Sequence, residues 1–116
     1  MTRKTDHSLE SIGYRFTNKS GKVLAISGDT AYAPEVIELG RDAHALVLEC
    51  SVPDSMQMPG HLTPSLAGRI ARECGCSTLY LTHFYPPCDS ADLVEPCSRE
   101  FQGRIVVAED LDEFSL

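Results

Sequence analysis

Two carboxylates and two imidazoles occupy positions from which they could bind a metal ion or transfer protons. Asp29, Glu49 and His83 each follow a short apolar run, and His61 precedes an expected helix. Carboxylate oxygens and imidazole nitrogens are ligands for zinc, manganese and iron. A catalytic metal normally has at least three protein ligands and one open position. Because Asp29 and His83 are the two strongest ligand candidates, the sequence predicts an incomplete metal site.

Each candidate also has an ordinary structural explanation. A Gly-Asp-Thr sequence after a strand is common in turns, where the Asp side chain binds nearby backbone amides. A histidine after an apolar strand, such as His83, is commonly satisfied by its neighbours. His61 can cap a helix or lie in solvent, and His7 and His44 have no partner that the sequence identifies. The residues alone therefore indicate a polar edge without assigning a reaction.

Alternating strand and helix patterns are expected to bring the candidate residues to one edge of a sheet. Residues 12–16 alternate apolar with polar side chains and form a predicted β-hairpin with residues 23–26. Residues 45–48, 78–81 and 104–108 are predicted to be further strands. With helices between them, these strands predict an α/β domain whose sheet is largely parallel or mixed. Ligands gather beyond the carboxyl ends of the strands in such sheets.

Proline positions mark the expected helices. A short helix is predicted between Pro34 and Gly40, because proline suits the first turn of a helix. Thr63 is a good cap for a second helix, in which residues 66, 70 and 74 form one apolar face. A third, weaker helical pattern covers residues 91–102, where Pro96 disfavours a regular helix.

Length and composition predict a single domain over residues 1–116. Hydrophobic residues make up 42% and charged residues 23%, which is typical of a globular protein. No apolar run approaches a membrane span or a signal peptide, so we expect a cytoplasmic protein without a membrane partner. The net charge is −7, from 10 basic and 17 acidic residues. Since nucleic-acid affinity depends on basic side chains, nucleic acid is a doubtful partner.

The five cysteines do not form a recognisable metal or disulfide pattern. Their odd number and the lack of a secretion signal argue against a disulfide framework. Cys74-Gly75-Cys76 has no second cysteine pair at the spacing of a zinc ribbon. We therefore expect free, partly buried thiols.

Four short motifs occur in order along the chain: Ser27-Gly28-Asp29-Thr30, Leu48-Glu49-Cys50-Ser51, His61-Leu62-Thr63-Pro64 with Ala67-Gly68, and Leu81-Thr82-His83-Phe84. Taken together, they resemble the C-terminal half of metallo-β-lactamase-fold proteins, particularly ribonuclease Z and its relatives. The segment from Asp6 to Phe16 also matches the strand that precedes the Gly-Asp-Thr in that group. This resemblance covers nearly the whole chain and implies half of an αββα sandwich, one mixed sheet with helices on its outer face.

The resemblance implies a role for each candidate residue. Family members hold two metals, usually zinc, that activate a water molecule. By resemblance, Asp29 is the bridging metal ligand and His83 is a terminal ligand. His61 matches a histidine near the scissile phosphate, and Glu49 matches the glutamate that orients it for proton transfer. The sequence departs from ribonuclease Z at Leu48-Glu49-Cys50-Ser51, where that enzyme has His-Glu-Ala-Thr, so a related phosphodiesterase or ester hydrolase fits equally well.

The family hallmark H-x-H-x-D-H is not found among the 116 residues, whose four histidines are His7, His44, His61 and His83. We therefore expect the C-terminal part of a metal-dependent hydrolase, inactive without the half that carries this motif. A non-catalytic, self-associating structural or interaction domain of the same fold is the alternative, and a mononuclear metal site at a dimer interface is a third reading. A half-sandwich exposes an apolar sheet face. The expected partner is thus a second copy, forming a homodimer, or a separately encoded N-terminal half.

Overall fold

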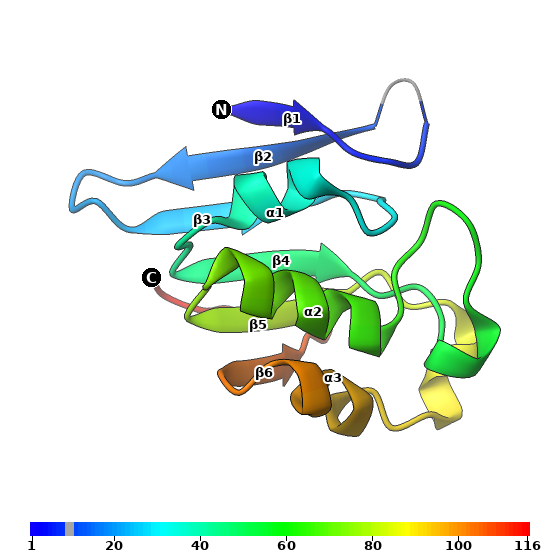
Figure 1. The fold of residues 1–116 in the computed structure, drawn as a ribbon. Helices are drawn as coiled ribbons and strands as arrows, with labels where there is room; N and C mark the ends of the chain where they lie inside the picture. The colour runs from blue at the N-terminus through cyan, green and yellow to red at the C-terminus, as the bar shows by residue number, and fades with distance from the viewer. Residues whose placement is uncertain (9–10) are drawn as a thin grey trace.

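One mixed sheet organises the chain in a computed structural model that describes residues 1–8 and 11–116 (Figure 1). Within these residues the sheet has six strands, which lie side by side in chain order. The first three strands pair antiparallel, and the third to the sixth pair parallel. The predicted mixed α/β sheet is confirmed. The strands are β1 (Thr2–Lys4), β2 (Ile12–Thr17), β3 (Val23–Ile26), β4 (Ala45–Glu49), β5 (Thr78–Thr82) and β6 (Arg104–Val107).

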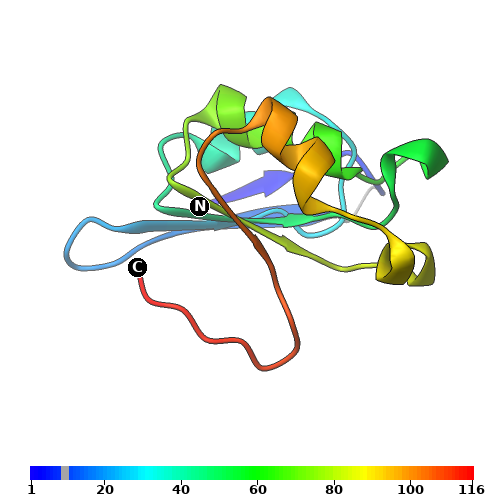
Figure 2. The same cartoon turned by 90° about the horizontal axis from the view of Figure 1, so that it is seen from below.

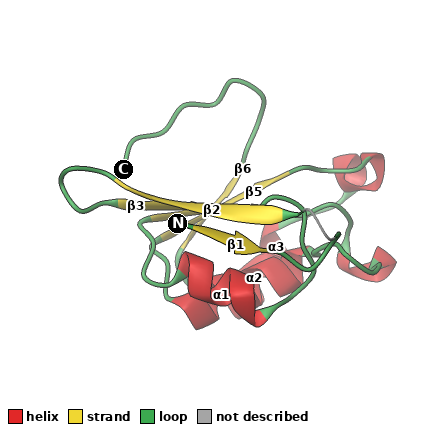
Figure 3. Ribbon diagram, turned by 90° about the horizontal axis from the view of Figure 1, so that it is seen from above, coloured by secondary structure: helices red, strands yellow, loops and turns green. Residues whose placement is uncertain are grey.

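The α-helices α1 (Pro34–Gly40), α2 (Pro64–Cys74) and α3 (Val94–Glu100) all cover the same face of the sheet (Figure 3). The hydroxyl of Thr63 accepts a hydrogen bond from the amide of Leu66, so the predicted cap of α2 is confirmed. The third helix is shorter than predicted and contains Pro96 in its first turn, where the missing amide hydrogen costs no helical bond. Over the described ranges, no helix has the length and hydrophobicity that crossing a membrane requires.

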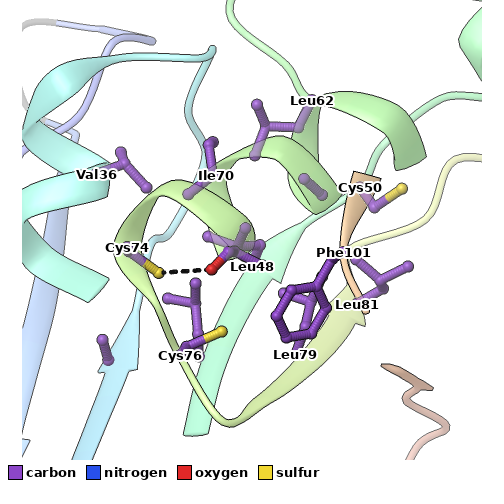
Figure 4. Close-up of a cluster of buried hydrophobic side chains, with 14 of the residues drawn as sticks. Val36, Leu48, Cys50, Leu62, Ile70, Cys74, Cys76, Leu79, Leu81 and Phe101 are labelled. Carbon is purple, nitrogen blue, oxygen red and sulfur yellow. Dashed lines mark hydrogen bonds between the residues drawn. The ribbon is translucent and has the colours of Figure 1, made fainter. Parts of the chain in front are cut away.

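Alternate strand residues build the core between the sheet and the helices (Figure 4). Leu46 and Leu48 of β4 and Leu79 and Leu81 of β5 are fully buried against the apolar face of α2. Gly68 allows α2 and α3 to approach closely, because a side-chain carbon there would lie 2.6 Å from a carbonyl oxygen of α3. The core thus fixes the strand ends that carry the candidate residues.

The cysteines belong to this core and are more deeply buried than the sequence predicts. All five are free thiols. Burial raises the pKa of Cys97 from 9.0 to about 12 and also raises the pKa of Cys50. A buried thiol with a raised pKa is unreactive, so Cys50 and Cys97 serve packing.

Among the described residues, no helix covers the opposite face of the sheet, which we call the open face (Figure 2). An apolar row crosses this face. Paired positions on five neighbouring strands point to this side because side chains alternate along each strand. Phe16, also on this side, is 52% exposed. The C-terminal segment runs back beneath this face and stacks Phe114 on Tyr80, with ring centroids 4.1 Å apart. The row consists of Tyr14, Ile26, Val47, Tyr80 and Val106.

Candidate active site

Three neighbouring parallel strands, β3, β4 and β5, end at the same edge of the sheet (Figure 1). The candidate residues lie at these ends, as the sequence pattern predicts. Asp29 follows β3, Glu49 ends β4 and His83 follows β5. The loop between β4 and α2 places His61 beside them, and the loop after β1 adds His7. His44 lies at the other end of the strands, where its Nδ1 atom accepts a 3.1 Å hydrogen bond from the amide of Val23.

Glu49 is the centre of a buried hydrogen-bond network. Its side chain is only 2% exposed, yet its carboxylate has five donors among the described residues. Oε1 accepts from the Thr30 amide at 3.2 Å and from His61 Nδ1 at 2.8 Å. Oε2 accepts from the amides of Ser51 and Leu62 and from the Ser51 hydroxyl. This complete set of donors compensates the cost of burying the carboxylate.

The contacts of Glu49 determine which nitrogen of His61 carries the proton. A carboxylate only accepts hydrogen bonds, so His61 Nδ1 must be the donor in the 2.8 Å contact with Glu49. In the neutral ring, His61 Nε2 then has a free lone pair. This lone pair lies 3.2 Å from the hydroxyl of Tyr85. The Glu49–His61 pair is therefore a carboxylate-oriented imidazole of the kind used in general acid–base chemistry.

Ser51 fixes the position of the proton on His83 in the same way. Its hydroxyl donates to Glu49 at 3.0 Å, so it accepts the hydrogen bond from His83 Nδ1, also at 3.0 Å. His83 Nε2 is left with its lone pair and lies 3.5 Å from Oδ1 of Asp29. The backbone of His83 has a φ of 61°, a conformation that is uncommon for a residue with a side chain. Strained residues of this kind are concentrated at functional sites.

His7 lies on the other side of Asp29, a position that the sequence analysis left open. Its Nδ1 atom is 2.8 Å from the carbonyl oxygen of Gly60, which can only accept, so Nδ1 carries the proton. The Nε2 lone pair of His7 lies 3.6 Å from Oδ2 of Asp29. The proximity of His7 to Asp29 could have been predicted from the β-hairpin. Antiparallel pairing of β2 and β3 brings the residues before β2 beside the residues after β3.

In the neutral form of both rings, the Asp29 carboxylate lies between two imidazole nitrogens that each have an unshared lone pair. Separations of 3.5 and 3.6 Å are too long for charge-assisted hydrogen bonds, which measure about 2.7–2.9 Å. They are close to the distance of about 3.3 Å between two ligand atoms of a tetrahedral zinc ion, whose bonds measure about 2.0–2.1 Å. Each Nε2 and the Asp29 oxygen that it faces are then both acceptors, and a shared cation would satisfy them. His7 and Asp29, and likewise Asp29 and His83, are spaced as two ligands of one metal ion.

A second ligand set is possible on distance alone. Glu49, His61 and His83 each offer one atom, and these atoms lie within 4.8 Å of one another. Both oxygens of Glu49 are already engaged by protein donors, and His61 Nδ1 donates to one of them. A metal bound there would displace buried hydrogen bonds, so Asp29 is the carboxylate that is freer to act as a ligand.

Comparison with known proteins identifies the family. A family profile described as "Beta-lactamase superfamily domain" matches residues 2–84. The solved structure of the metallo-β-lactamase fold protein YhfI from Bacillus subtilis is similar at a TM-score of 0.83 and 26% identity, covering 94% of this chain. The short form of human tRNase Z is similar at a TM-score of 0.74 and 25% identity, covering 98% of this chain. The chain belongs to the metallo-β-lactamase superfamily.

The relatives are much longer than this chain. An uncharacterized protein of Mycobacterium tuberculosis is 35% identical over 107 residues, which are 90% of this chain and 39% of that protein. Ribonuclease Z of Myxococcus xanthus is 36% identical over 98 residues, 79% of this chain and 32% of that enzyme. The chain also covers 46% of the YhfI structure and 41% of the human tRNase Z structure. The 116 residues thus correspond to less than half of each of these proteins.

Proposed function

We propose that the chain supplies one half of the active centre of a metal-dependent hydrolase that cleaves phosphodiesters or related esters. The observation that carries this proposal is the position of Asp29 between the lone pairs of His7 Nε2 and His83 Nε2, at 3.6 and 3.5 Å. These three residues would hold the metal, and zinc is the family's usual ion. A bound ion of this kind lowers the pKa of its water and polarises the ester.

His61 is the proton-transfer group of the proposed site. Glu49 fixes its tautomer and its ring orientation, and Ser51 links the same carboxylate to His83. Oriented in this way, His61 Nε2 can deliver a proton to the oxygen of the leaving group or receive one from it. Glu49 is a positioning residue, because both of its oxygens are engaged by the protein.

The remaining ligands would come from a second sheet that packs on the open face. Two observations support this packing. An apolar row crosses five strands of the open face, and this chain corresponds to only 39% of the mycobacterial relative. We propose that this second sheet is the part of the longer relatives that this chain does not cover, and that it carries the H-x-H-x-D-H motif. A second copy of this chain is less favoured because both copies would carry the same net charge of −7.

Complementation tests the proposal. The chain is combined with the H-x-H-x-D-H half of the mycobacterial relative and zinc, and hydrolysis of bis(p-nitrophenyl) phosphate and p-nitrophenyl acetate is measured. Hydrolysis is expected only when both halves are present, and Asp29→Asn should abolish it. The exposed substitution Asp110→Asn should leave it unchanged. Equal hydrolysis with and without Asp29 would contradict the proposal.

The second candidate function is a non-catalytic domain that associates through the open face. The observation in its favour is the exposure of Phe16 and Tyr14, which are 52% and 42% exposed in a sheet without helices on that side. Sedimentation of the chain alone at micromolar concentration distinguishes the two. Dimers that form without metal and survive Asp29→Asn would favour the interaction domain.

A further inference from the structure

Tyr85 lies in the candidate site although neither the sequence motifs nor the proposed metal ligands include it. It follows His83 by two residues and starts the 3₁₀-helix η2 (Pro86–Ser90) as its cap. Its backbone is fixed on both sides, because its amide donates to the carbonyl of Ser51 at 2.9 Å and its carbonyl accepts from the amide of Cys88 at 2.9 Å. The position of its ring is therefore set by the same strand end that holds the Glu49 network.

The side chain of Tyr85 contacts two of the three imidazoles. Its ring centroid is 5.3 Å from that of His61, in an edge arrangement, and 5.6 Å from that of His83. Its hydroxyl lies 3.2 Å from His61 Nε2, the nitrogen that faces away from Glu49. Because His61 Nδ1 donates to Glu49, Nε2 is an acceptor and the Tyr85 hydroxyl must donate to it.

We infer that Tyr85 is a positioning residue that holds the reactive nitrogen of His61. The imidazole is then fixed at both nitrogens, by Glu49 at Nδ1 and by Tyr85 at Nε2, before a substrate enters. A substrate oxygen that bonded to this nitrogen would have to take the place of the Tyr85 hydroxyl. Tyr85 therefore orients His61 and shields its lone pair in the free protein. This inference rests on the proposed role of His61, but the hydrogen bond can be tested independently of hydrolysis.

Chemical modification of histidine tests the shielding. Diethyl pyrocarbonate acylates unprotonated imidazole nitrogens, and mass spectrometry of peptides measures the rate at each histidine. In Tyr85→Phe, the rate at His61 should rise by about two- to tenfold, the factor expected for loss of one hydrogen bond. The rate at His44 is the internal control and should not change. Tyr80→Phe, which removes a hydroxyl on the open face, is the control variant and should leave the rate at His61 unchanged. An unchanged rate at His61 in a folded Tyr85→Phe protein would overturn the inference.

Nuclear magnetic resonance of the unsubstituted chain gives a second test that needs no variant. Long-range proton–nitrogen spectra of the imidazoles should assign His61 as protonated at Nδ1, with an Nε2 that accepts a hydrogen bond. Tyr85→Phe should move the Nε2 resonance toward that of an unbonded nitrogen and leave Nδ1 in place. A His61 ring protonated at Nε2 would overturn the inference. Zinc binding should be the same in Tyr85→Phe and in the unsubstituted chain, which separates this result from a failure of the metal site.

Discussion

Glu49 Oε1 accepts a 2.8 Å hydrogen bond from His61 Nδ1, and both side chains are nearly inaccessible, at 2% and 6% exposure. The pair lies below the surface of the site, whereas Asp29 and His83 are 35% and 42% exposed at its mouth. The site therefore has a rigid inner layer that orients imidazoles and an outer layer that can reach a ligand. This division explains why Glu49 orients its neighbours while Asp29 remains free for a metal.

Glu49→Gln should destabilise the fold. The new NH2 group is a donor, and it would face protein donors that now bind the carboxylate, such as the amides of Ser51 and Leu62. A buried group left without its partner costs about 1–3 kcal/mol in the free energy of unfolding. Urea unfolding measures this change. Glu38→Gln, in an exposed ion pair with Arg3, is the control and should change stability by less than about 1 kcal/mol. Equal effects of the two substitutions would contradict the buried network.

Ser51→Ala should weaken metal binding without removing a ligand. The Ser51 hydroxyl accepts the hydrogen bond from His83 Nδ1 and thereby keeps the lone pair on the Nε2 atom that faces Asp29. Loss of such an outer partner typically lowers metal affinity by about ten- to a hundredfold. Calorimetric titration with zinc measures the affinity. Ser98→Ala, which removes a hydroxyl bonded to a backbone carbonyl on α3, should leave the affinity unchanged.

Gly60→Ala tests whether His7 belongs to the site. Gly60 and Gly21 both have a positive φ, at 77° and 84°, so alanine is strained at either position. A side-chain carbon at Gly60 would lie 3.0 Å from His7 Nδ1, whereas at Gly21 it meets nothing within 4 Å. The two variants should lose similar stability, roughly 1–2 kcal/mol, because a side-chain carbon is strained in the left-handed region. Only Gly60→Ala should also weaken zinc binding, and His7→Ala should weaken it too. Equal zinc affinities of the two glycine variants would exclude His7 from the metal site.

Phe16→Ser should reduce association through the open face. Phe16 is 52% exposed beside the apolar row, and burying the exposed half in an interface would contribute about 1–1.5 kcal/mol. Sedimentation equilibrium of the chain, alone and with the H-x-H-x-D-H half of a relative, measures the association. Val94→Ser is the control, because Val94 is exposed on the helical side. Equal association of both variants would place the interface elsewhere.

Local patterns in the sequence predict most of the fold. The alternation in residues 12–16, the apolar runs of the parallel strands, the proline that starts the first helix and the Thr63 cap of the second all correspond to observed elements. The strand β1 was not predicted because its three residues, Thr2–Lys4, are polar and pair only at the edge of the sheet. Parallel order then explains why Asp29, Glu49 and His83 meet at one edge.

The fine structure of the site could not be predicted in the same way. Ser51 and Tyr85 enter it through loop conformations and through hydrogen bonds that depend on single atoms. A serine after a strand or a tyrosine before two prolines carries no pattern that distinguishes it from an ordinary loop residue. Only the positions of the backbone and side chains show that these residues surround the candidate imidazoles.

Zinc titration of the 116-residue chain, compared with Asp29→Asn and with the exposed control Asp110→Asn, tests the central claim most directly. The claim is that Asp29 and the imidazoles of His7 and His83 form a cation site that this chain holds only in part. The account predicts weak, reversible binding of zinc that Asp110→Asn preserves and that Asp29→Asn reduces by at least about tenfold, a loss of 1.4 kcal/mol or more. Binding of equal strength in all three proteins, or its absence from the unsubstituted chain, would contradict it.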